Sequence, residues 1–384
     1  MALLSVGVFG SSHKAHEMRV PIHPEQLEWI APDARQKIYL EKGYGERFGL
    51  SDAQLAEHVA GILPREQLFA QCDIALIPKP VAKDLQAMRP GTILWGWPHC
   101  VQQQDITQTA IDRKLTLIAF EAMHKWGSAG DWQMHIFARN NEIAGYAGIL
   151  HAMNLLGIDG TYGPRRKAAV ISFGSVSRGA ITALQARGVQ DISVFTHRRA
   201  IFVADRKPGI EHFRFEEGDD GRLIVHYPDR DQRPLIEELA EADIIVNGTL
   251  QDTDSPLMFV HDDEMDRLKH GCLIADISCD EGMGFSFARP TTFDEPMFEV
   301  GPVHYYAVDH TPSYLWNAAS WEISSALVPY MPVVMQGPER WAESETLTRA
   351  IEIRDGVIEN PKILSFQGRE EAYPHAVVKD HIAT

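Results

Sequence analysis

Three polar residues in the first third of the chain each follow a short apolar run. Lys79 comes after "DIALIP", His99 after "ILWGWP" and Glu121 after "TLIAF". Runs of this kind predict buried parallel strands, whose carboxyl ends meet at one edge of a sheet. An imidazole donates and accepts protons near neutral pH, so His99 is our candidate general acid/base. The alternative is that His99 is one structural histidine among the 17 of the chain.

A second chemical signal is a turn rich in glycine and serine. Residues 167–199 read "KAAVISFGSVSRGAITALQARGVQDISVFTHRR", the strand, turn, helix and strand of a dinucleotide-binding unit. Small turn residues let backbone N–H groups approach a pyrophosphate at the helix N-terminus. Because the spacing G-x-x-x-x-G departs from the usual G-x-G-x-x-G, an ordinary strand-to-helix turn is the alternative. We predict cofactor contacts from Gly174, Ser175, Val176, Ser177 and Gly179.

The end of the second strand in this unit indicates which cofactor is bound. An NAD site usually carries an acidic residue there for the ribose hydroxyls, but this chain has His197, Arg198 and Arg199. Arginines can bind a 2′-phosphate, so NADP(H) is favoured over NAD(H), with a solvated basic turn as the alternative. Gly248 and Thr249 end a further strand, where contacts with the cofactor are also expected.

Strand-like and helix-like segments alternate, which predicts an α/β fold with parallel sheets. We expect two Rossmann-like domains with the active site in the cleft between them. The catalytic domain is discontinuous, 1–140 plus 313–384, and the dinucleotide-binding domain is 141–312. The segment 216–223 is predicted to be a surface hairpin or loop, and 368–384 a loosely held tail. Strands are expected at 4–8, 37–40, 74–76, 92–95, 116–119, 168–172, 192–195, 244–247, 273–276 and 305–308, and helices at 24–30, 52–60, 143–156, 180–186, 234–240 and 314–328.

The composition limits the possible partners and compartments. The formal net charge of −17 argues against nucleic acid or an anionic membrane as the main partner. Four isolated cysteines indicate a reducing compartment and no metal site. No apolar stretch approaches the roughly 20 residues that span a bilayer, and the start of the chain lacks the basic region of an export signal. We expect a cytoplasmic protein.

Several motifs together resemble the alanine dehydrogenase and pyridine nucleotide transhydrogenase family. "EMRVPIHP" is similar to its E-x-R-V-x-x-x-P start, "IPKP" to its lysine strand and "WPHC" to its histidine. "AFEAM", "NEIAGYAG" and "ADISCDEGMGFSFARPTTFDEPMF" match later landmarks in the same order, as do "VHYYAVDHTPS" and "LVPY". The turn "GSVSRGA" and the segment around "FARNNEIAGYAG" look more like the opine-type branch, which includes N5-(carboxyethyl)ornithine synthase and saccharopine dehydrogenase.

The resemblance implies roles for individual residues. Arg19 would anchor a substrate carboxylate, with a surface salt bridge to Glu17 as the alternative. Lys79 would hold the keto acid or transfer a proton. Glu121 would tune Lys79 or His99 or bind the amine, or else it only caps the next segment. By analogy with the saccharopine branch, Arg139 would hold the second substrate's carboxylate. Asp280 would face the nicotinamide, whereas Asp276 is expected to be structural.

The implied activity is the reductive condensation of an α-keto acid, pyruvate or 2-oxoglutarate, with the amine of an amino acid such as ornithine or lysine. The alternatives are alanine dehydrogenase, which uses ammonia as the amine, and a non-catalytic nucleotide sensor. The Trp- and His-rich insert 124–139 is expected to shape the amine pocket. The resemblance also allows a homo-oligomer.

Overall fold

The computed structural model describes residues 3–198, 209–227, 231–252 and 255–378. These residues form two compact units: 139–315 is one, and 1–138 together with 316–384 is the other. We call the discontinuous one the first unit and 139–315 the second. The predicted cofactor residue Arg199 and the end of the predicted tail, 379–384, lie outside the described residues.

The first unit is built on an eight-stranded sheet, as far as its described residues show. Its strand order is β21-β20-β6-β5-β4-β1-β2-β3, in which β1 to β6 are parallel and β20 and β21 are antiparallel. The parallel part has the 3-2-1-4-5-6 order of a doubly wound fold. The strands are β1 (Val6–Val8), β2 (Ile38–Glu41), β3 (Gly61–Leu63), β4 (Ile74–Ile77), β5 (Ile93–Gly96), β6 (Thr116–Ala119), β20 (Ile351–Arg354) and β21 (Val357–Ile358).

Apolar side chains cover both faces of this sheet. Trp95 and Ile118 belong to the core on one face, and Leu94 and Leu117 to the core on the other, because side chains alternate along a strand. The helical segments of this unit are η1 (Pro24–Trp29), α1 (Pro32–Arg35), η2 (Glu46–Phe48), α2 (Asp52–Ala56), α3 (Arg65–Gln71), α4 (Ala82–Ala87), α5 (Gln104–Asp112), η3 (Phe120–Ala122), α9 (Trp316–Leu327), η7 (Val328–Tyr330), α10 (Met331–Met335), α11 (Pro338–Trp341), α12 (Glu345–Thr348) and α13 (Pro361–Gln367).

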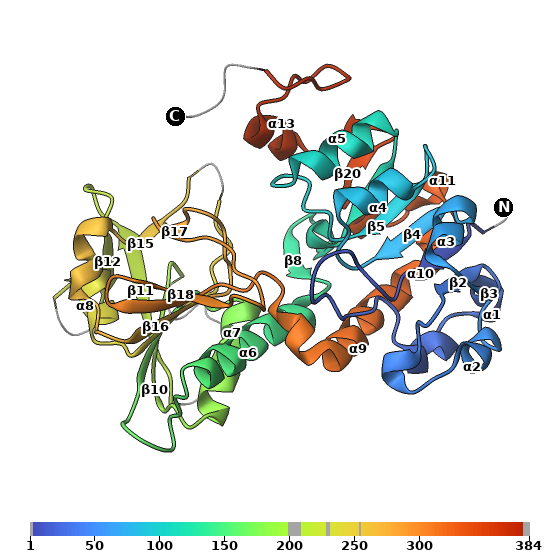
Figure 1. Cartoon of the computed structure of the whole chain (residues 1–384). Coiled ribbons are helices and arrows are strands. Elements are labelled where there is room, and N and C mark those ends of the chain that lie inside the picture. Colours follow the sequence, from blue (N-terminus) through green and yellow to red (C-terminus); the bar gives the residue numbers. More distant parts are fainter. Residues whose placement is uncertain (1–2, 199–208, 228–230, 253–254, 379–384) are drawn as a thin grey trace. The chain divides into compact units, whose positions relative to one another are not determined.

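The last part of the chain returns to the first unit. Figure 1 shows α13, in red, beside α5, and β20 pairs with β6 of the same sheet. The prediction of a loose tail is wrong for 368–378. The Arg369 side chain is buried and donates to Gln367 Oε1 (2.6 Å), Gln108 Oε1 (2.9 Å) and the His375 carbonyl (3.1 Å). A buried guanidinium must be hydrogen-bonded, so it fixes the backbone around it.

The second unit contains a nine-stranded sheet within its described residues, in the order β13-β12-β11-β10-β9-β14-β16-β19-β18. The six strands from β11 to β19 repeat the doubly wound order. These strands are β9 (Lys167–Ile171), β10 (Asp191–Thr196), β11 (Glu211–Glu217), β12 (Leu223–His226), β13 (Arg233–Pro234), β14 (Ile244–Asn247), β16 (Cys272–Asp276), β18 (Met297–Val300) and β19 (Val303–Tyr306). The predicted hairpin at 216–223 is confirmed by the antiparallel pair β11 and β12.

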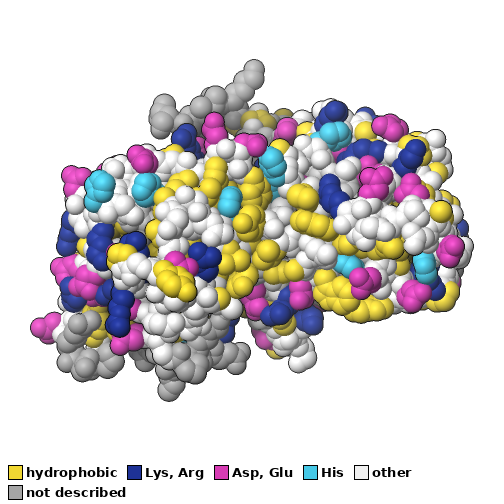
Figure 2. Space-filling model, turned by 60° about the horizontal axis from the view of Figure 1, so that its bottom comes forward, with side chains coloured by type: hydrophobic (Ala, Val, Ile, Leu, Met, Phe, Trp, Pro, Cys, Tyr) yellow, Lys and Arg dark blue, Asp and Glu magenta, His cyan; other side chains and the backbone are white. Residues whose placement is uncertain are grey.

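The remaining elements complete the second unit. A small sheet pairs β15 (Met258–Val260) with β17 (Gly284–Phe285). The helical segments are α6 (Ala138–Leu155), α7 (Ser175–Ala186), α8 (Leu235–Ala240), η5 (Asp262–Arg267) and η6 (Thr311–Leu315). The predicted class, α/β with two Rossmann-like units, is confirmed. No helix among the described residues is both long and apolar enough to cross a membrane. On the face drawn in Figure 2, acidic and basic side chains are interspersed.

Helices α6 and α7 cross with their backbones in contact. A Cβ atom on Gly179 would stand 1.7 Å from the Glu142 carbonyl oxygen, and one on Gly145 would stand 1.9 Å from the Val176 carbonyl oxygen. No larger residue fits either position without moving a helix. Gly179 therefore has a packing role that is independent of any cofactor.

We predict that Gly179→Ala lowers the free energy of unfolding by about 2 kcal/mol, because the added methyl group overpacks the helix contact. Chemical denaturation monitored by circular dichroism measures this. Gly61→Ala is the control, since its Cβ would make only ordinary contacts with Tyr39, at 3.5 Å. Equal stability of the two variants would contradict the assignment.

Candidate active site

Lys79, His99 and Glu121 follow three adjacent parallel strands. They come after β4, β5 and β6, which pair in register with one another. The carboxyl ends of these strands share one edge of the sheet, and we call it the polar edge of the first unit.

Glu121 is bonded directly to His99. The His99 backbone N–H donates to Glu121 Oε1 (2.7 Å), and the same oxygen lies 3.9 Å from His99 Nδ1. The backbone of His99 is left-handed, with φ 49°. Such a conformation in a residue other than glycine costs on the order of 1 kcal/mol and persists only where its surroundings enforce it. Glu121 thus holds the turn that presents the imidazole.

The surroundings of the Glu121 carboxyl raise its pKa. Oε2 is buried and has no hydrogen-bond partner among the described residues. Burial raises the pKa of Glu121 to about 8, helped by the charge of Glu352 and opposed by the His99 N–H and Lys79. At neutral pH most of this carboxyl is therefore neutral, and it can donate a proton or a hydrogen bond.

Arg19 lies in the segment after β1 and is buried with Glu17. Its Nε donates to Glu17 Oε1 (2.8 Å) and its Nη2 to Oε2 (2.5 Å), and both side chains are almost completely buried. The guanidinium carbon also stands 5.0 Å from the centre of the Trp97 ring. The salt bridge with Glu17, which the sequence offered as a surface alternative, is thus a buried pair. A substrate carboxylate bound by Arg19 would share the guanidinium with Glu17.

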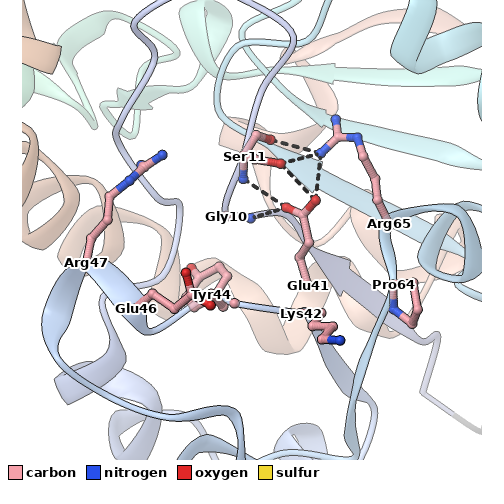
Figure 3. A pocket seen from close by; sticks show the side chains of 10 residues that line it. Gly10, Ser11, Glu41, Lys42, Tyr44, Glu46, Arg47, Pro64 and Arg65 are labelled. Atoms are coloured by element: carbon pink, nitrogen blue, oxygen red, sulfur yellow. Dashed lines mark hydrogen bonds and ion pairs between the residues drawn. The ribbon is translucent and has the colours of Figure 1, made fainter.

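A charged network holds the loop that leads to Arg19. Glu41 Oε2 accepts the backbone N–H groups of Gly10 and Ser11, each at 2.8 Å, and Arg65 bridges Glu41 and the Ser11 carbonyl (Figure 3). These residues line a cavity of about 480 Å³. Ser12 Oγ in the same loop donates to the Lys79 carbonyl (2.5 Å). In a doubly wound fold this turn is where a nucleotide would bind, but Glu41 satisfies its N–H groups instead.

The Trp- and His-rich insert folds as a hairpin of β7 (His124–Trp126) and β8 (Trp132–His135). His135 Nε2 lies 3.2 Å from the Glu121 carbonyl oxygen, and burial lowers the pKa of His135 to about 4. At neutral pH the ring is therefore neutral. Arg349 stacks 3.9 Å over the Trp126 ring, which ties the hairpin to the end of α12.

In the second unit, the turn between β9 and α7 has a different register from the one that its glycines suggest. Ser172 adopts a left-handed backbone, with φ 81°, where a dinucleotide fold uses its first glycine. Gly174 precedes α7 as its N-cap, and the fully buried Ser177 packs against β9 through Oγ and the Ile171 carbonyl (3.3 Å). The fingerprint is S-x-G-x-x-S. Gly174, Ser175 and Val176 are half-buried at the start of α7, whereas Ser177 is fully buried.

Two loops beside this turn are bonded to each other. Asp276 at the end of β16 accepts from Tyr305 Oη (2.8 Å), the Cys279 N–H (2.9 Å) and Asn247 Nδ2 (3.1 Å). Asn247 Oδ1 in turn accepts the Thr249 N–H (3.1 Å). Burial raises the pKa of Asp276 to about 6 despite these three donors. Asp276 thus fixes the loop that contains Asp280, whose own pKa is raised by burial.

A pyridine nucleotide fits the residues at this edge. The start of α7 presents backbone N–H groups without a side-chain cap, and Gly248 lies so close that a Cβ would stand 2.5 Å from Ser177 Oγ. Thr249 Oγ1 is buried and has no partner within the described residues, so it can bond a ligand. His197 and Arg198 are exposed just after β10, where the ribose is bound in this fold.

Other residues complete the description. Arg139 lies in the first turn of α6 and pairs with Glu142 at 2.6 Å.

The described parts of the chain contain no group of three or more His, Cys, Asp and Glu residues that could hold a metal ion. Sequence reasoning missed Glu352. It also missed the hydrogen bond between Nδ1 of the buried His310 and Oδ1 of the partly exposed Asp309 (2.5 Å), just after β19. The signal for that pair was the motif "VHYYAVDHTPS", which was read as a landmark only.

We predict that Ser172→Val lowers the free energy of unfolding by about 2 kcal/mol, because a β-branched side chain is strained at positive φ. Ser172→Gly should stay within about 0.5 kcal/mol of the unaltered protein and keep its cofactor affinity. Denaturation and cofactor titration of this pair measure both effects. Equal loss in the two variants would contradict the left-handed turn.

Comparisons with known proteins agree with this geometry. The alanine dehydrogenase/PNT N-terminal domain model matches residues 11–144, and the C-terminal domain model matches 194–361. An N(5)-(carboxyethyl)ornithine synthase of Clostridium botulinum is 28% identical over 321 residues, 81% of this chain and 89% of that protein. An alanine dehydrogenase of Mycobacterium tuberculosis is 23% identical over 378 residues, 95% of this chain and 97% of that protein.

Solved structures share the fold. An L-alanine dehydrogenase has a TM-score of 0.73 at 16% identity and covers 94% of this chain and 99% of its own. A transhydrogenase from Sinorhizobium meliloti has a TM-score of 0.66 at 17% identity and covers 93% and 99%. The two family models account for most of the described chain, and the cofactor turn lies between them. The chain belongs to the alanine dehydrogenase/PNT family and is a pyridine nucleotide-dependent oxidoreductase that acts on amino groups.

Proposed function

We propose that this enzyme is an opine-type dehydrogenase. It condenses an α-keto acid, pyruvate or 2-oxoglutarate, with the side-chain amine of an amino acid such as ornithine or lysine and reduces the product. The observation that supports this most directly is Glu121. It adds a proton-carrying carboxyl beside Lys79 and His99, and its backbone contacts the aromatic hairpin β7–β8.

The reaction needs several proton transfers to and from the nitrogen and the oxygen that are bonded to the keto carbon. The amine nitrogen attacks the keto carbon and loses a proton to His99, while the Lys79 ammonium polarises the keto oxygen. That oxygen leaves as water after protonation, for which the neutral Glu121 carboxyl is suited. The resulting iminium carbon accepts a hydride and becomes a secondary amine. Overall, the keto acid, the amine, one hydride and one proton give the product and one water.

The substrate carboxylates require cationic side chains. Arg19 is the proposed anchor for the keto acid, and Arg139 for the amino acid. A nicotinamide cofactor bound at the second unit supplies the hydride. The residues proposed to hold it are Gly174, Ser175, Val176, His197, Arg198, Gly248 and Thr249, with Asp280 at the nicotinamide.

NADPH is the proposed reductant. Arg198 and His197 occupy the place where an NAD enzyme carries an acid, and Arg198 is exposed and able to turn toward a 2′-phosphate. An acidic residue that binds the ribose hydroxyls would favour NADH. The described end of β10 has none, because it reads Thr196, His197 and Arg198.

Alanine dehydrogenase is the second candidate. The relatives with this name align with nearly the whole chain, and ammonia would need no amine pocket. A steady-state panel of amines and keto acids with NADPH and NADH separates the two. We expect turnover with diamino acids. Turnover of pyruvate with ammonia, and none with any diamino acid, would reject the proposal.

We predict that Lys79→Met lowers kcat at least 100-fold and leaves cofactor affinity unchanged, because it removes a charge from the reacting carbonyl only. Lys83→Met, at an exposed position of α4, is the matched control and should keep full activity. Stopped-flow kinetics and cofactor titration measure the two effects. Full activity of Lys79→Met would remove Lys79 from the mechanism.

We predict that Arg198→Ala weakens NADPH binding roughly tenfold and leaves NADH binding unchanged, since the lost hydrogen bond involves only the 2′-phosphate. Exposed Arg165 supplies the control, Arg165→Ala, which alters the net charge equally. Fluorescence titration with both nucleotides measures the affinities. An equal effect on both would contradict a phosphate-binding role.

A further inference from the structure

A charged residue is buried inside the first unit where the strands β20 and β6 pair. Glu352 is 6% exposed and belongs to β20. The register shifts there: Ile351 pairs with Ile118, and Ile353 pairs with Leu117. Two steps along β20 thus match one step along β6, which makes Glu352 the extra residue of a β-bulge. Bulges beside active sites redirect a side chain.

The surroundings of Glu352 do not neutralise it. Its Oε2 accepts from Asn360 Nδ2 (2.9 Å), a neutral donor, and no ion pair involves it among the described residues. Burial raises the pKa of Glu352, and the Asn360 hydrogen bond opposes that rise. A carboxyl buried in this way costs stability and calls for a functional reason.

Glu352 is close to the polar edge. The strand β6 leads into Glu121, and the Ala119 N–H beside it donates to the Ala350 carbonyl (2.8 Å), next to Glu352 in the chain. Cys100 follows His99, is fully buried and has its pKa raised by burial and by the charges of both Glu352 and Glu121. The buried Cys100 and Glu352 and the partly exposed Glu121 therefore form one cluster next to His99.

We propose that Glu352 is a positioning residue that keeps Glu121 neutral at the polar edge of the first unit. It acts through Glu121, because two neighbouring carboxyls cannot both ionise readily, even where only one of them is fully buried. The role of Glu121 in the reaction rests on the proposed function. The neutral state has a direct use: a neutral Glu121 does not repel the carboxylate of an α-keto acid.

The other charged and titratable groups around Glu121 come from three segments. One of these groups is the His99 imidazole, whose Nδ1 lies 3.9 Å from Glu121 Oε1. Lys79, which follows β4, opposes the rise in the pKa of Glu121, and so does the hydrogen bond from the His99 N–H. Buried Cys100 is uncharged at neutral pH, and neutral His135 faces the Glu121 carbonyl from β8. Glu352 is the acidic side chain that acts on Glu121, so it is the group to change.

The test is an infrared pH titration of the carboxyl of Glu121. The protonated-carboxyl band assigned to it is the one that is lost in Glu121→Gln. In the unaltered protein this band should titrate with a midpoint at about pH 8. In Glu352→Gln the midpoint should fall by about one pH unit or more, because the like charge is gone.

The matched control is Glu359→Gln. Glu359 lies nearby in the sequence, has a side chain that is 37% exposed and pairs with Arg354 at 2.5 Å. The substitution Glu359→Gln removes the same charge as Glu352→Gln, but from the surface rather than from the core. The midpoint of the Glu121 titration should therefore stay at about pH 8. Equal midpoints in Glu352→Gln and Glu359→Gln would overturn the inference.

A second variant covers the case in which Glu352→Gln does not fold. Asn360→Ser keeps the N-cap of α13 and withdraws the donor from Glu352, which then stays protonated over more of the pH range. The Glu121 midpoint should move in the same direction, by a smaller amount. An upward shift, or none, would also count against the inference.

Thermal unfolding gives an independent reading. The pKa of Glu121 is higher in the folded state than in the unfolded state, where it is 4.5. The contribution of Glu121 to the free energy of unfolding is therefore complete below pH 4.5 and is lost as the pH rises toward about 8. In Glu352→Gln this loss should end at a lower pH. None of these measurements requires turnover, so an enzyme inactive with every amine would reject the proposed function and leave this inference standing.

Discussion

The structure depends on one constraint: a parallel sheet buried on both faces can present polar side chains only at the ends of its strands. In both units the apolar strands end in loops at the carboxyl edge. Lys79, His99 and Glu121 come together there because β4, β5 and β6 are neighbours in register. The cofactor turn and the loops after β14 and β16 meet in the second unit for the same reason.

Charged groups buried behind these edges determine how the exposed residues behave. The pair of Glu17 and Arg19 and the carboxyls of Asp276 and Glu352 are ionisable groups held away from water. Each costs desolvation energy, and removal of one partner leaves the other uncompensated. The first unit also keeps a nucleotide-like turn whose N–H groups are bound by Glu41 rather than by a phosphate. The same fold thus serves two chemical purposes in one chain.

The sequence predicted the strands and the class of fold well because buried parallel strands have short, strongly apolar runs. It predicted helices less well. The segment 52–60 folds as the short α2 followed by a turn, and 24–30 is a 3₁₀ helix, since periodicity does not fix the end of a short helix. The β20–β21 pair was missed because it forms only by returning to β6 from more than two hundred residues away.

The sequence by itself singled out the residues that we propose to carry chemistry: the amine of Lys79, the imidazole of His99, the carboxyl of Glu121 and a small-residue turn before α7. Only the tertiary structure decided their states. Ser172 takes the place of a glycine because its backbone is left-handed, and Gly179 is reserved for helix packing. Burial and the charge of Glu352, far away in the chain, raise the pKa of Glu121. Residue type is local, whereas burial and neighbouring charge arise only when distant segments pack together.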